Sequence, residues 1–340
     1  MGEIITIGLD IAKNVFQVHG VDAAGPVVLQ RRLRRADVLR FFGGLERCIV
    51  GLEACASAHY WARKIRATGH EVRLIAPSHV KPYVKRGKKN DAADAAAICE
   101  AMSRPQMRFV PVKSEEQQGT LMLHRVRDLL VRQRTMLINA LRSHLAEFGI
   151  VARQGKGGLA ELMSMLSQTR LPDPARDALN AIAGQIEELR GKIKELERQI
   201  ALQHRGDEAS QRLATIPGFG PIIASAIASS VPDASMFKSA RQFAAWLGLV
   251  PGQNSSGGKE RLGRITKTGD RYLRKLLVIG ATGLVRYKRK TIPGGIEWVN
   301  KLLARKKVRV VTVALANKMA RIAWAILSRG EVYRHTASAA

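Results

Sequence analysis

The chain has 340 residues, of which 46% are hydrophobic, so most of it is expected to fold, as two domains or as one domain with an appendage. Lys and Arg total 56 against 28 Asp and Glu, which gives a formal net charge of +28 at pH 7. This excess is too large for solubility alone. It predicts a polyanionic partner, with nucleic acid ahead of an anionic membrane and an inert basic surface as the alternative.

Neither a membrane span nor a secretion signal is predicted. The most apolar late stretch, residues 310–327, is interrupted by Lys318 and Arg321, so we expect it not to cross a membrane. The opening MGEIITIGLD has neither a basic leader nor a small-residue cleavage site, which predicts a cytoplasmic protein. The three cysteines show no CxxC spacing, so we expect reduced, mostly buried thiols rather than disulfides or a zinc site. They are Cys48, Cys55 and Cys99.

Residues 1 to about 102 alternate between strand and helix patterns. Three short apolar runs, IITIGLDIA, VFQVHGVD and VVLQRRL, are separated by KN and AAGP, which is typical of a meander of hairpins. They are followed by the helical ADVLRFFGGL, the apolar CIVGLEA, an amphipathic segment that ends at Gly69, and the strand VRLIAP. This order predicts a mixed α/β sheet, and the two prolines of residues 103–114 predict a linker after it.

Two long helices are predicted next. Residues 114–148 carry apolar side chains near one helical face, namely Leu123, Val126, Leu130, Leu137, Leu141 and Leu145. The second helix has two apolar rows with sevenfold spacing, Leu179, Ile186, Ile193 and Ile200 in one and Ile182, Leu189 and Leu196 in the other. This heptad pattern predicts a coiled coil, within one chain or between two, that serves as a scaffold. Because the repeat is short, two ordinary helices of a globular bundle are an open alternative.

The segment LATIPGFGPIIASAIAS, residues 213–229, has two apolar helical halves joined by a Pro-Gly-Phe-Gly-Pro turn. Such a turn aims backbone N–H groups outward near a helix N-terminus, which suits a phosphate. The pattern is typical of helix-hairpin-helix modules that hold a nucleic-acid backbone, with Gly218 and Gly220 in the turn. A tight helix–helix turn without a ligand is the alternative.

Four acidic residues predict a divalent metal site. Asp10 ends the first strand, Glu53 ends the run IVGLE, and Asp91 and Asp94 share one face at the start of a helix. Carboxylates from separate segments that meet at a sheet edge repel one another unless cations neutralise them, and Mg²⁺ prefers oxygen ligands. Two such ions would support phosphodiester chemistry. Alternatively, Asn90 or Asp91 caps the helix and the acids of its first turn only favour the helix dipole.

The opening GLDIAK, with Lys13, also resembles the start of sugar kinases and related ATPases, where the loop meets ATP phosphates. Those enzymes need a second half with a glycine-rich phosphate loop after another strand and Asp. No such half is found, because the later glycines lie in PGFGP, SSGGK and PGG within a helical region.

The stretch from 243 to 277 combines a Gly- and Ser-rich loop with a run of basic residues, Arg261, Arg264, Lys267, Arg271, Arg274 and Lys275. Ser256, followed by Gly257, could approach a phosphate closely, and the guanidinium groups would stabilise negative charge as a serine oxygen attacked phosphorus. The residues alone favour the alternative of a DNA-contacting loop whose serines only donate hydrogen bonds, since no histidine base lies nearby in sequence.

Taken in order, GLDIAK, GLEA, KNDAADA, IPGFGP and FAAWLGLVP…SSGGK…RITKTGDRYLRKLL resemble the DEDD transposases of bacterial insertion sequences, the bridge-RNA-guided recombinases. The resemblance covers nearly the whole chain, and SSGGK is similar to the subgroup that often inserts into specific repeated sites. It implies a RuvC-like, RNase H-type domain over residues 1–112 and coiled-coil helices over 113–205 that join subunits. A mainly helical transposase domain with the helix-hairpin-helix and the serine loop is implied over residues 206–340.

The resemblance also implies roles for residues. Asp10, Glu53, Asp91 and Asp94 would bind Mg²⁺ in a two-metal site, with Mn²⁺ as a substitute, and Ser256 would attack DNA to form a transient phosphoserine link. The family pattern places this serine before a glycine, which selects Ser256 and leaves Ser255 as the alternative. The basic residues predicted to contact nucleic acid are Lys13, Lys88, Lys89, Lys259, Arg261, Arg264, Lys267, Arg271 and Arg274.

The implied partners are the DNA of the element ends and of the target, a guide RNA, and further copies of the chain in a homodimer or homotetramer near the nucleoid. Acids of one subunit would then act with the serine of another. We therefore predict a site-specific DNA recombinase that moves its own element without ATP, because a serine ester conserves the energy of the phosphodiester. The rivals are a metal-dependent nuclease or junction resolvase without a covalent intermediate, and a non-catalytic architectural DNA-binding protein.

Overall fold

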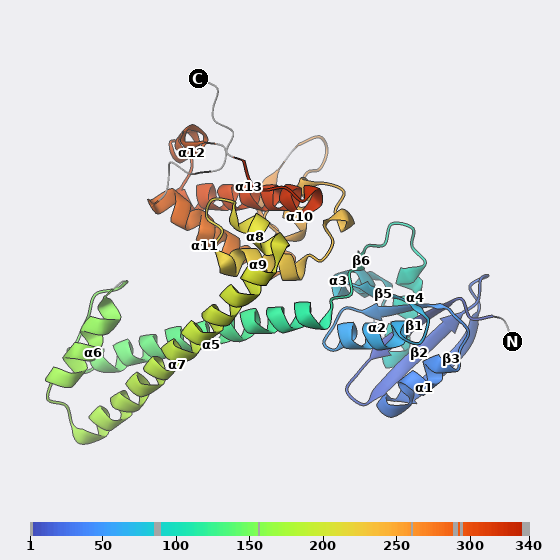
Figure 1. Cartoon of the computed structure of the whole chain (residues 1–340), viewed down its shortest axis with the longest axis horizontal. Helices are drawn as coiled ribbons and strands as arrows, with labels where there is room; N and C mark the ends of the chain where they lie inside the picture. The colour runs from blue at the N-terminus through green and yellow to red at the C-terminus, as the bar shows by residue number, and fades with distance from the viewer. Residues whose placement is uncertain are drawn as a thin grey trace. The chain divides into compact units, whose positions relative to one another are not determined.

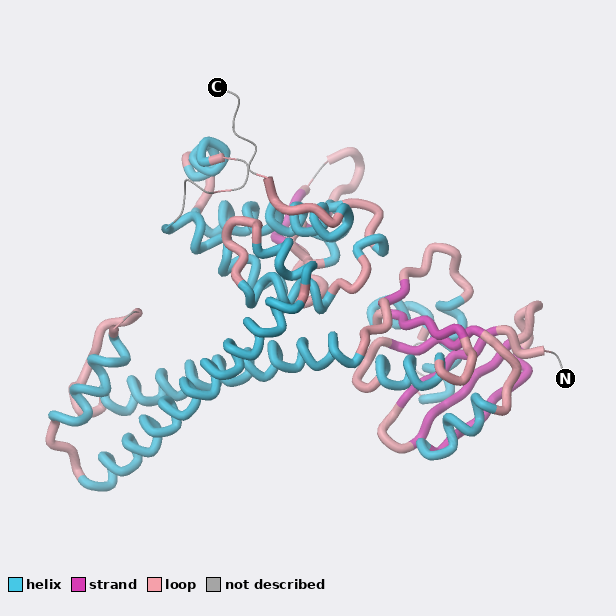
Figure 2. Tube along the Cα trace, viewed as in Figure 1, coloured by secondary structure: helices cyan, strands magenta, loops and turns pink. Residues whose placement is uncertain are grey.

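The computed structural model describes residues 3–84, 90–155, 157–259, 261–287, 292 and 295–334, and the chain forms two compact units, Met1–Glu115 and Glu116–Ala340 (Figure 1). The first is a mixed α/β unit and the second is mainly helical (Figure 2). Both features agree with the α/β and helical halves predicted from the sequence. The helices predicted over residues 113–205 lie almost entirely in the second unit.

The first unit is built on a six-stranded sheet in the order β3-β2-β1-β4-β5-β6. Its strands are β1 (Thr6–Ile11), β2 (Val15–Val21), β3 (Val27–Arg34), β4 (Ile49–Glu53), β5 (Glu71–Ile75) and β6 (Phe109–Val110). The first three form the predicted antiparallel meander, whereas β4 and β5 run parallel to β1. This arrangement is consistent with a RuvC-like domain. The predicted linker 103–114 is partly wrong, because β6 pairs antiparallel with β5 at the sheet edge.

Helices cover both faces of this sheet. They are α1 (Val38–Gly43), α2 (Ala58–Arg66), α3 (Pro77–Val80) and α4 (Asp91–Met102), with short 3-10 turns at Arg35–Asp37 and Lys81–Tyr83. One face packs on α1 and α2 through alternate residues of the strands, such as Ile7, Leu9 and Leu52. The other face packs on α4. Cys48 and Cys99 are buried in this unit, whereas Cys55 is exposed.

The packing of α4 depends on two glycines. A Cβ at Gly8 of β1 would lie 2.1 Å from the carbonyl oxygen of Ala95, and one at Gly51 of β4 would lie 2.5 Å from Cγ of Met102. Real Cβ atoms do not approach other atoms so closely, so only glycine lets the backbone of α4 settle onto the sheet at these points. The position of α4 is therefore fixed by β1 and β4.

The second unit begins with long helices, α5 (Glu115–Ala146) and α7 (Asp173–Gly206), with α6 (Gly158–Gln168) between them in sequence. The two long helices lie side by side, as Figures 1 and 2 show, and Arg127 of α5 contacts Glu197 of α7 at 2.6 Å. The buried residues of α7 are the predicted row Leu179, Ile186, Ile193 and Ile200. On α5 the predicted face is only partly buried, because Leu141 and Leu145 are buried but Val126 is 39% exposed.

The rest of the second unit is a helical domain with one small ribbon. Its elements are α8 (Glu208–Ala214), α9 (Pro221–Ser230), a 3-10 turn (Ala234–Met236), α10 (Ala240–Trp246), β7 (Pro251–Gln253), β8 (Leu262–Ile265), α11 (Arg271–Tyr287), α12 (Ile296–Leu303) and α13 (Val308–Arg329). In the described part of the chain, α13 is the one helix whose length and composition would allow it to cross a membrane. One face of it lies in the domain core instead, with Leu315, Met319 and Ala323 fully buried.

Candidate active site

Asp10 and Glu53 lie next to each other at one edge of the sheet. The parallel strands β1 and β4 pair with Leu9 opposite Leu52, so the residues that follow are neighbours where both strands end. Side chains alternate along a strand, so Asp10 and Glu53 share the face of Gly8 and Gly51, the face that α4 covers. Carboxyl ends of parallel strands are the usual place for a ligand in open α/β sheets.

Asp91 and Asp94 reach the same edge from the first turn of α4. Ala95 lies over Gly8, and Ile98 and Met102 lie over Gly51. Asp91 lies four residues before Ala95 and Asp94 four residues before Ile98, so both extend this sheet-facing side of the helix toward the ends of β1 and β4. The capping alternative is answered by Asn90, whose side chain accepts the N–H of Ala93 at 2.7 Å. The cap is therefore supplied without either aspartate.

The four carboxylates interact electrostatically. Burial, followed by the charges of Asp94, Asp91 and Glu53, raises the pKa of Asp10 to about 6. Burial and the charge of Asp94 also raise the pKa of Glu53. No Lys or Arg in the described ranges lies within ion-pair distance of any of these groups. The predicted Lys88 and Lys89 lie outside the described residues, and the described Lys13 is exposed.

This donor set suits a hard divalent cation, because it offers only carboxylate oxygens and lacks a described countercharge. Within the described ranges, no three His, Cys, Asp or Glu side chains already stand close enough together to hold a metal ion. Binding an ion would therefore require the carboxylates to turn toward a shared centre. The sequence expectation of a two-metal site stays a prediction.

Ser256 stands at the tip of the β7–β8 ribbon. The N–H of Lys259 donates to the carbonyl oxygen of Ser256 at 3.1 Å, and Gly257 and Gly258 between them have φ of 56° and 75°. Two consecutive positive φ angles define a tight hairpin turn that strongly favours glycine. The neighbouring Ser255 is engaged, because its Oγ accepts the N–H of Arg261 at 3.2 Å. The hydroxyl of Ser256 has no hydrogen-bond partner among the described residues and is exposed.

The ribbon is fixed at its base. Nη1 of Arg274 donates to the carbonyl oxygens of both Leu247 and Thr268, at 2.9 and 2.8 Å. Asp270 accepts the N–H groups of Tyr272 and Leu273 and thereby caps α11. Arg274, predicted to contact nucleic acid, thus makes structural contacts here. The other predicted basic residues of this region are exposed, namely Lys259, Arg261, Arg264, Lys267 and Arg271.

The predicted helix-hairpin-helix lies at α8 and α9. Gly218 has φ of 85°, and a Cβ there would lie 2.8 Å from Cδ1 of Leu284, so its glycine is explained by core packing. Gly220 is exposed and stands at the N-terminus of α9, with open space around a Cβ. Of the two predicted contact glycines, only Gly220 is open to a phosphate.

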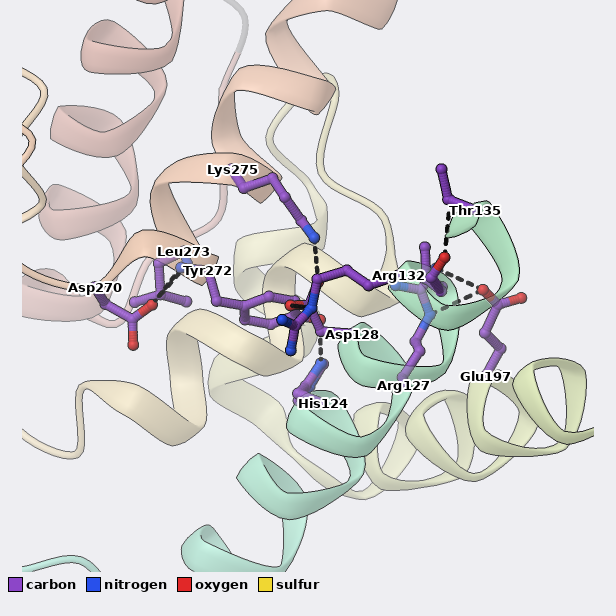
Figure 3. A network of polar contacts seen from close by, with 11 residues as sticks. His124, Arg127, Asp128, Arg132, Thr135, Glu197, Asp270, Tyr272, Leu273 and Lys275 are labelled. Carbon is purple, nitrogen blue, oxygen red and sulfur yellow. Dashed lines mark hydrogen bonds and ion pairs between the residues drawn. The ribbon is translucent and has the colours of Figure 1, made fainter. Parts of the chain in front are cut away.

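A polar network that the sequence did not indicate joins α5 to α7 and α11 (Figure 3). His124 of α5 is fully buried, with Nδ1 3.1 Å from the Tyr272 hydroxyl of α11 and Nε2 3.2 Å from Oγ of Ser225 in α9. Burial and the nearby Arg127 lower the pKa of His124 to about 4, so the ring is neutral at pH 7. Lys275 adds an ion pair to Asp128 of α5. The network joins α5 to the two helices that support the catalytic candidate Ser256 and the hairpin.

A family model described as "Transposase IS116/IS110/IS902 family" matches residues 210–293, and a second one, described as a transposase of the DEDD type, matches residues 7–150. The chain is 54% identical over 332 residues to the "Probable family 20 transposase" of Pseudomonas aeruginosa, covering 96% of this chain and 98% of that protein.

Two further relatives are named for insertion sequences. The transposase for insertion sequence element IS1328 of Yersinia enterocolitica is 42% identical, over 98% of this chain and 99% of its own length. The transposase for insertion sequence element IS1111A of Coxiella burnetii is 40% identical, over 98% of this chain and 92% of its own length. The matches extend through both the acidic and the serine regions.

Proposed function

The chain belongs to the IS116/IS110/IS902 family of transposases, enzymes that cleave and rejoin DNA, and we propose that it does so through a transient ester between Ser256 and a DNA phosphate. The observation that carries the proposal is the proximity of Asp10, Glu53, Asp91 and Asp94 where β1 and β4 end and α4 begins. The position of Asp91 and Asp94 depends on Gly8 and Gly51, which let the backbone of α4 approach the sheet closely.

In this proposal Asp10, Glu53, Asp91 and Asp94 would hold Mg²⁺, with Mn²⁺ as a substitute, which would stabilise the attacking and leaving oxygens of the phosphodiester. The DEDD transposase family is typically dependent on divalent metal ions. The charge repulsion that raises the pKa of Asp10 supports this role, because a cation would relieve it. A RuvC-like, RNase H-type assignment of the first unit agrees with its strand order.

Ser256 supplies the nucleophile in this proposal. Its Oγ gives up its proton and forms a bond to phosphorus, the bond from phosphorus to one deoxyribose oxygen breaks, and that oxygen takes up a proton, so the step balances. The reverse attack by a deoxyribose hydroxyl frees Ser256 and rejoins the strand, so no ATP is consumed. Ser256 is favoured over Ser255 because the hydroxyl of Ser255 already accepts a hydrogen bond from the ribbon backbone. Exposed Lys259, Arg261 and Arg264 would stabilise the charge on the phosphate.

A covalent adduct tests the serine. Purified protein would be incubated with Mg²⁺ and a DNA carrying the element ends, quenched in detergent, and resolved for protein-linked DNA. We expect the adduct with the wild type and with Ser255→Ala, and its loss with Ser256→Ala. Cleavage by Ser256→Ala without an adduct would instead identify a metal-dependent nuclease or resolvase. If the wild type neither cleaves DNA nor forms an adduct, and Asp10→Ala and Asp91→Ala bind DNA as it does, only the architectural role is left.

The partners beyond DNA are further parts of the proposal. A guide RNA is supported by the net charge of +28 and the family resemblance, and composite sites would follow from a homodimer or homotetramer. Sequencing the nucleic acid that copurifies at moderate salt tests the RNA. A single discrete RNA species is expected, and a mixture that reflects bulk cellular RNA would contradict guidance.

A further inference from the structure

A groove of about 1070 Å³ lies in the second unit, between α13 and the β7–β8 ribbon. We call it the α13 groove. Its floor is made by α13 side chains at helical spacing, among them Val310, Val313 and Ile322. Trp298 of α12 and Ile265 of β8 form walls. These residues belong to the ribbon that carries Ser256 and to the helices packed beside it.

The groove accounts for apolar residues of α13 that lie outside the domain core. One side of the helix, with Leu315, Met319 and Ala323, is fully buried in the core. The groove side carries apolar residues between charged ones: Val313 and Ile322 are half-buried, and Val310 is 54% exposed. A helix that contacts water on one side normally carries polar residues there. A groove with an apolar floor is a typical place for a ligand.

Four cations surround this apolar floor, namely Arg264, Arg309, Lys318 and Arg321. None of them forms an ion pair with an acidic side chain in the described ranges. The ammonium group of Lys318 lies 4.7 Å from the ring centroid of Trp298. The ligand should therefore combine anionic groups with flat apolar surfaces.

Unpaired nucleotides have this combination, whereas a duplex hides the faces of its bases. We propose that the α13 groove binds an unpaired segment of the DNA strand that this transposase cleaves and rejoins. Bases lie on the apolar floor and stack on Trp298, while phosphates contact Arg264, Arg309 and Arg321. Because Arg264 and Ile265 belong to the same ribbon as Ser256, a strand held in the groove continues toward the serine.

The chain offers a matched pair of variants for the test. Val310 lines the groove, and Val308, on the same helix, does not line it. Their exposed fractions are 54% and 52%, so Val310→Glu and Val308→Glu make the same chemical change at similar exposure. The full-length protein would be titrated, in chelator and without Mg²⁺, against blunt duplex DNA and against the same duplex with a single-stranded overhang containing 2-aminopurine. Omitting the metal separates this binding from the proposed serine chemistry.

We expect Val310→Glu to lower affinity for the overhang DNA about tenfold or more, because the new carboxylate would repel the phosphates and displace the stacked bases from the apolar floor. Val308→Glu should change the affinity for the overhang DNA less than about twofold. The two variants should bind blunt duplex DNA with the same affinity. In the wild type, stacking on Trp298 should quench the fluorescence of 2-aminopurine. Trp298→Ala should remove this quenching, and Trp298→Phe should retain it.

Equal effects of the two glutamate variants would overturn the proposal. Tighter binding of an RNA overhang than of the DNA overhang would overturn it too. A change in light-scattering mass with Val310→Glu, without a change in DNA affinity, would assign the groove to a second copy of the chain. Circular dichroism and thermal melting of each variant establish that it is folded. Loss of the serine adduct with normal overhang binding would refute the proposed chemistry and leave the groove assignment intact.

Discussion

Replacing Gly8 by Ala is expected to disable the acidic site before it unfolds the protein. The added Cβ would meet the carbonyl oxygen of Ala95 at 2.1 Å and the N of Cys99 at 2.7 Å, both in the backbone of α4. Backbone cannot rotate away as a side chain can, so α4 must move outward. Overpacking of this kind costs about 1–3 kcal/mol, and the displacement carries Asp91 and Asp94 away from Asp10.

Two measurements separate the effects. Urea unfolding should show a loss of about 1–3 kcal/mol, and DNA cleavage under native conditions should fall by far more than the fraction of unfolded protein. Gly43→Ala is the control, because a Cβ at this position in α1 has open space around it. If Gly8→Ala cleaves DNA and binds Mn²⁺ as well as the wild type, the argument that β1 positions α4 is wrong.

Three further predictions concern the second unit. The pKa of His124 is about 4 in the folded state against 6.5 ordinarily, so the unfolded chain binds more protons than the folded chain between pH 4 and pH 6.5. The free energy of unfolding in urea should therefore be highest above pH 6.5 and fall by about 3 kcal/mol as the pH is lowered to 4. In His124→Leu this pH dependence should disappear. Gly258→Ala should abolish the serine adduct at a cost of about 1–2 kcal/mol in stability, because its φ is 75°, whereas Gly252→Ala, with ordinary contacts, should retain the adduct. Met136→Glu should shift light-scattering mass toward the monomer, because Met122, Val126, Leu129 and Met136 form an exposed apolar stripe on α5; an unchanged mass would contradict pairing through this stripe.

Local patterns predicted the elements of the first unit well, because alternation and helical periodicity are written in consecutive residues. The strand ends at Asp10 and Glu53 followed from the same patterns. What the sequence could not decide was whether Asp91 capped its helix, since Asn90 is an equally good cap. The edge strand at Phe109–Val110 was also missed, because its pairing with β5 is a tertiary contact and its neighbours include proline.

Predictions for the second unit failed where polar residues are buried. In α5 the apolar pattern pointed to Val126, yet the structure buries His124, whose hydrogen bonds come from α9 and α11. A histidine is buried only where distant partners satisfy it, and those partners cannot be read from the helix itself. The only signal was a lone histidine between Leu123 and Val126, within a helix of otherwise regular pattern. The α13 groove was hidden for the same reason, since it is made by segments far apart in sequence.

The docking of α4 on Gly8 and Gly51 has a consequence for biosynthesis. Asp10 leaves the ribosome early, but its partners Asp91 and Asp94 reach it only when the helix ending at Met102 has been made and has settled onto the sheet. Contacts between residues so distant in sequence form late in folding. A chain that ends before Met102 therefore cannot bring the four carboxylates together, so any chemistry that they carry begins only when the first unit is complete.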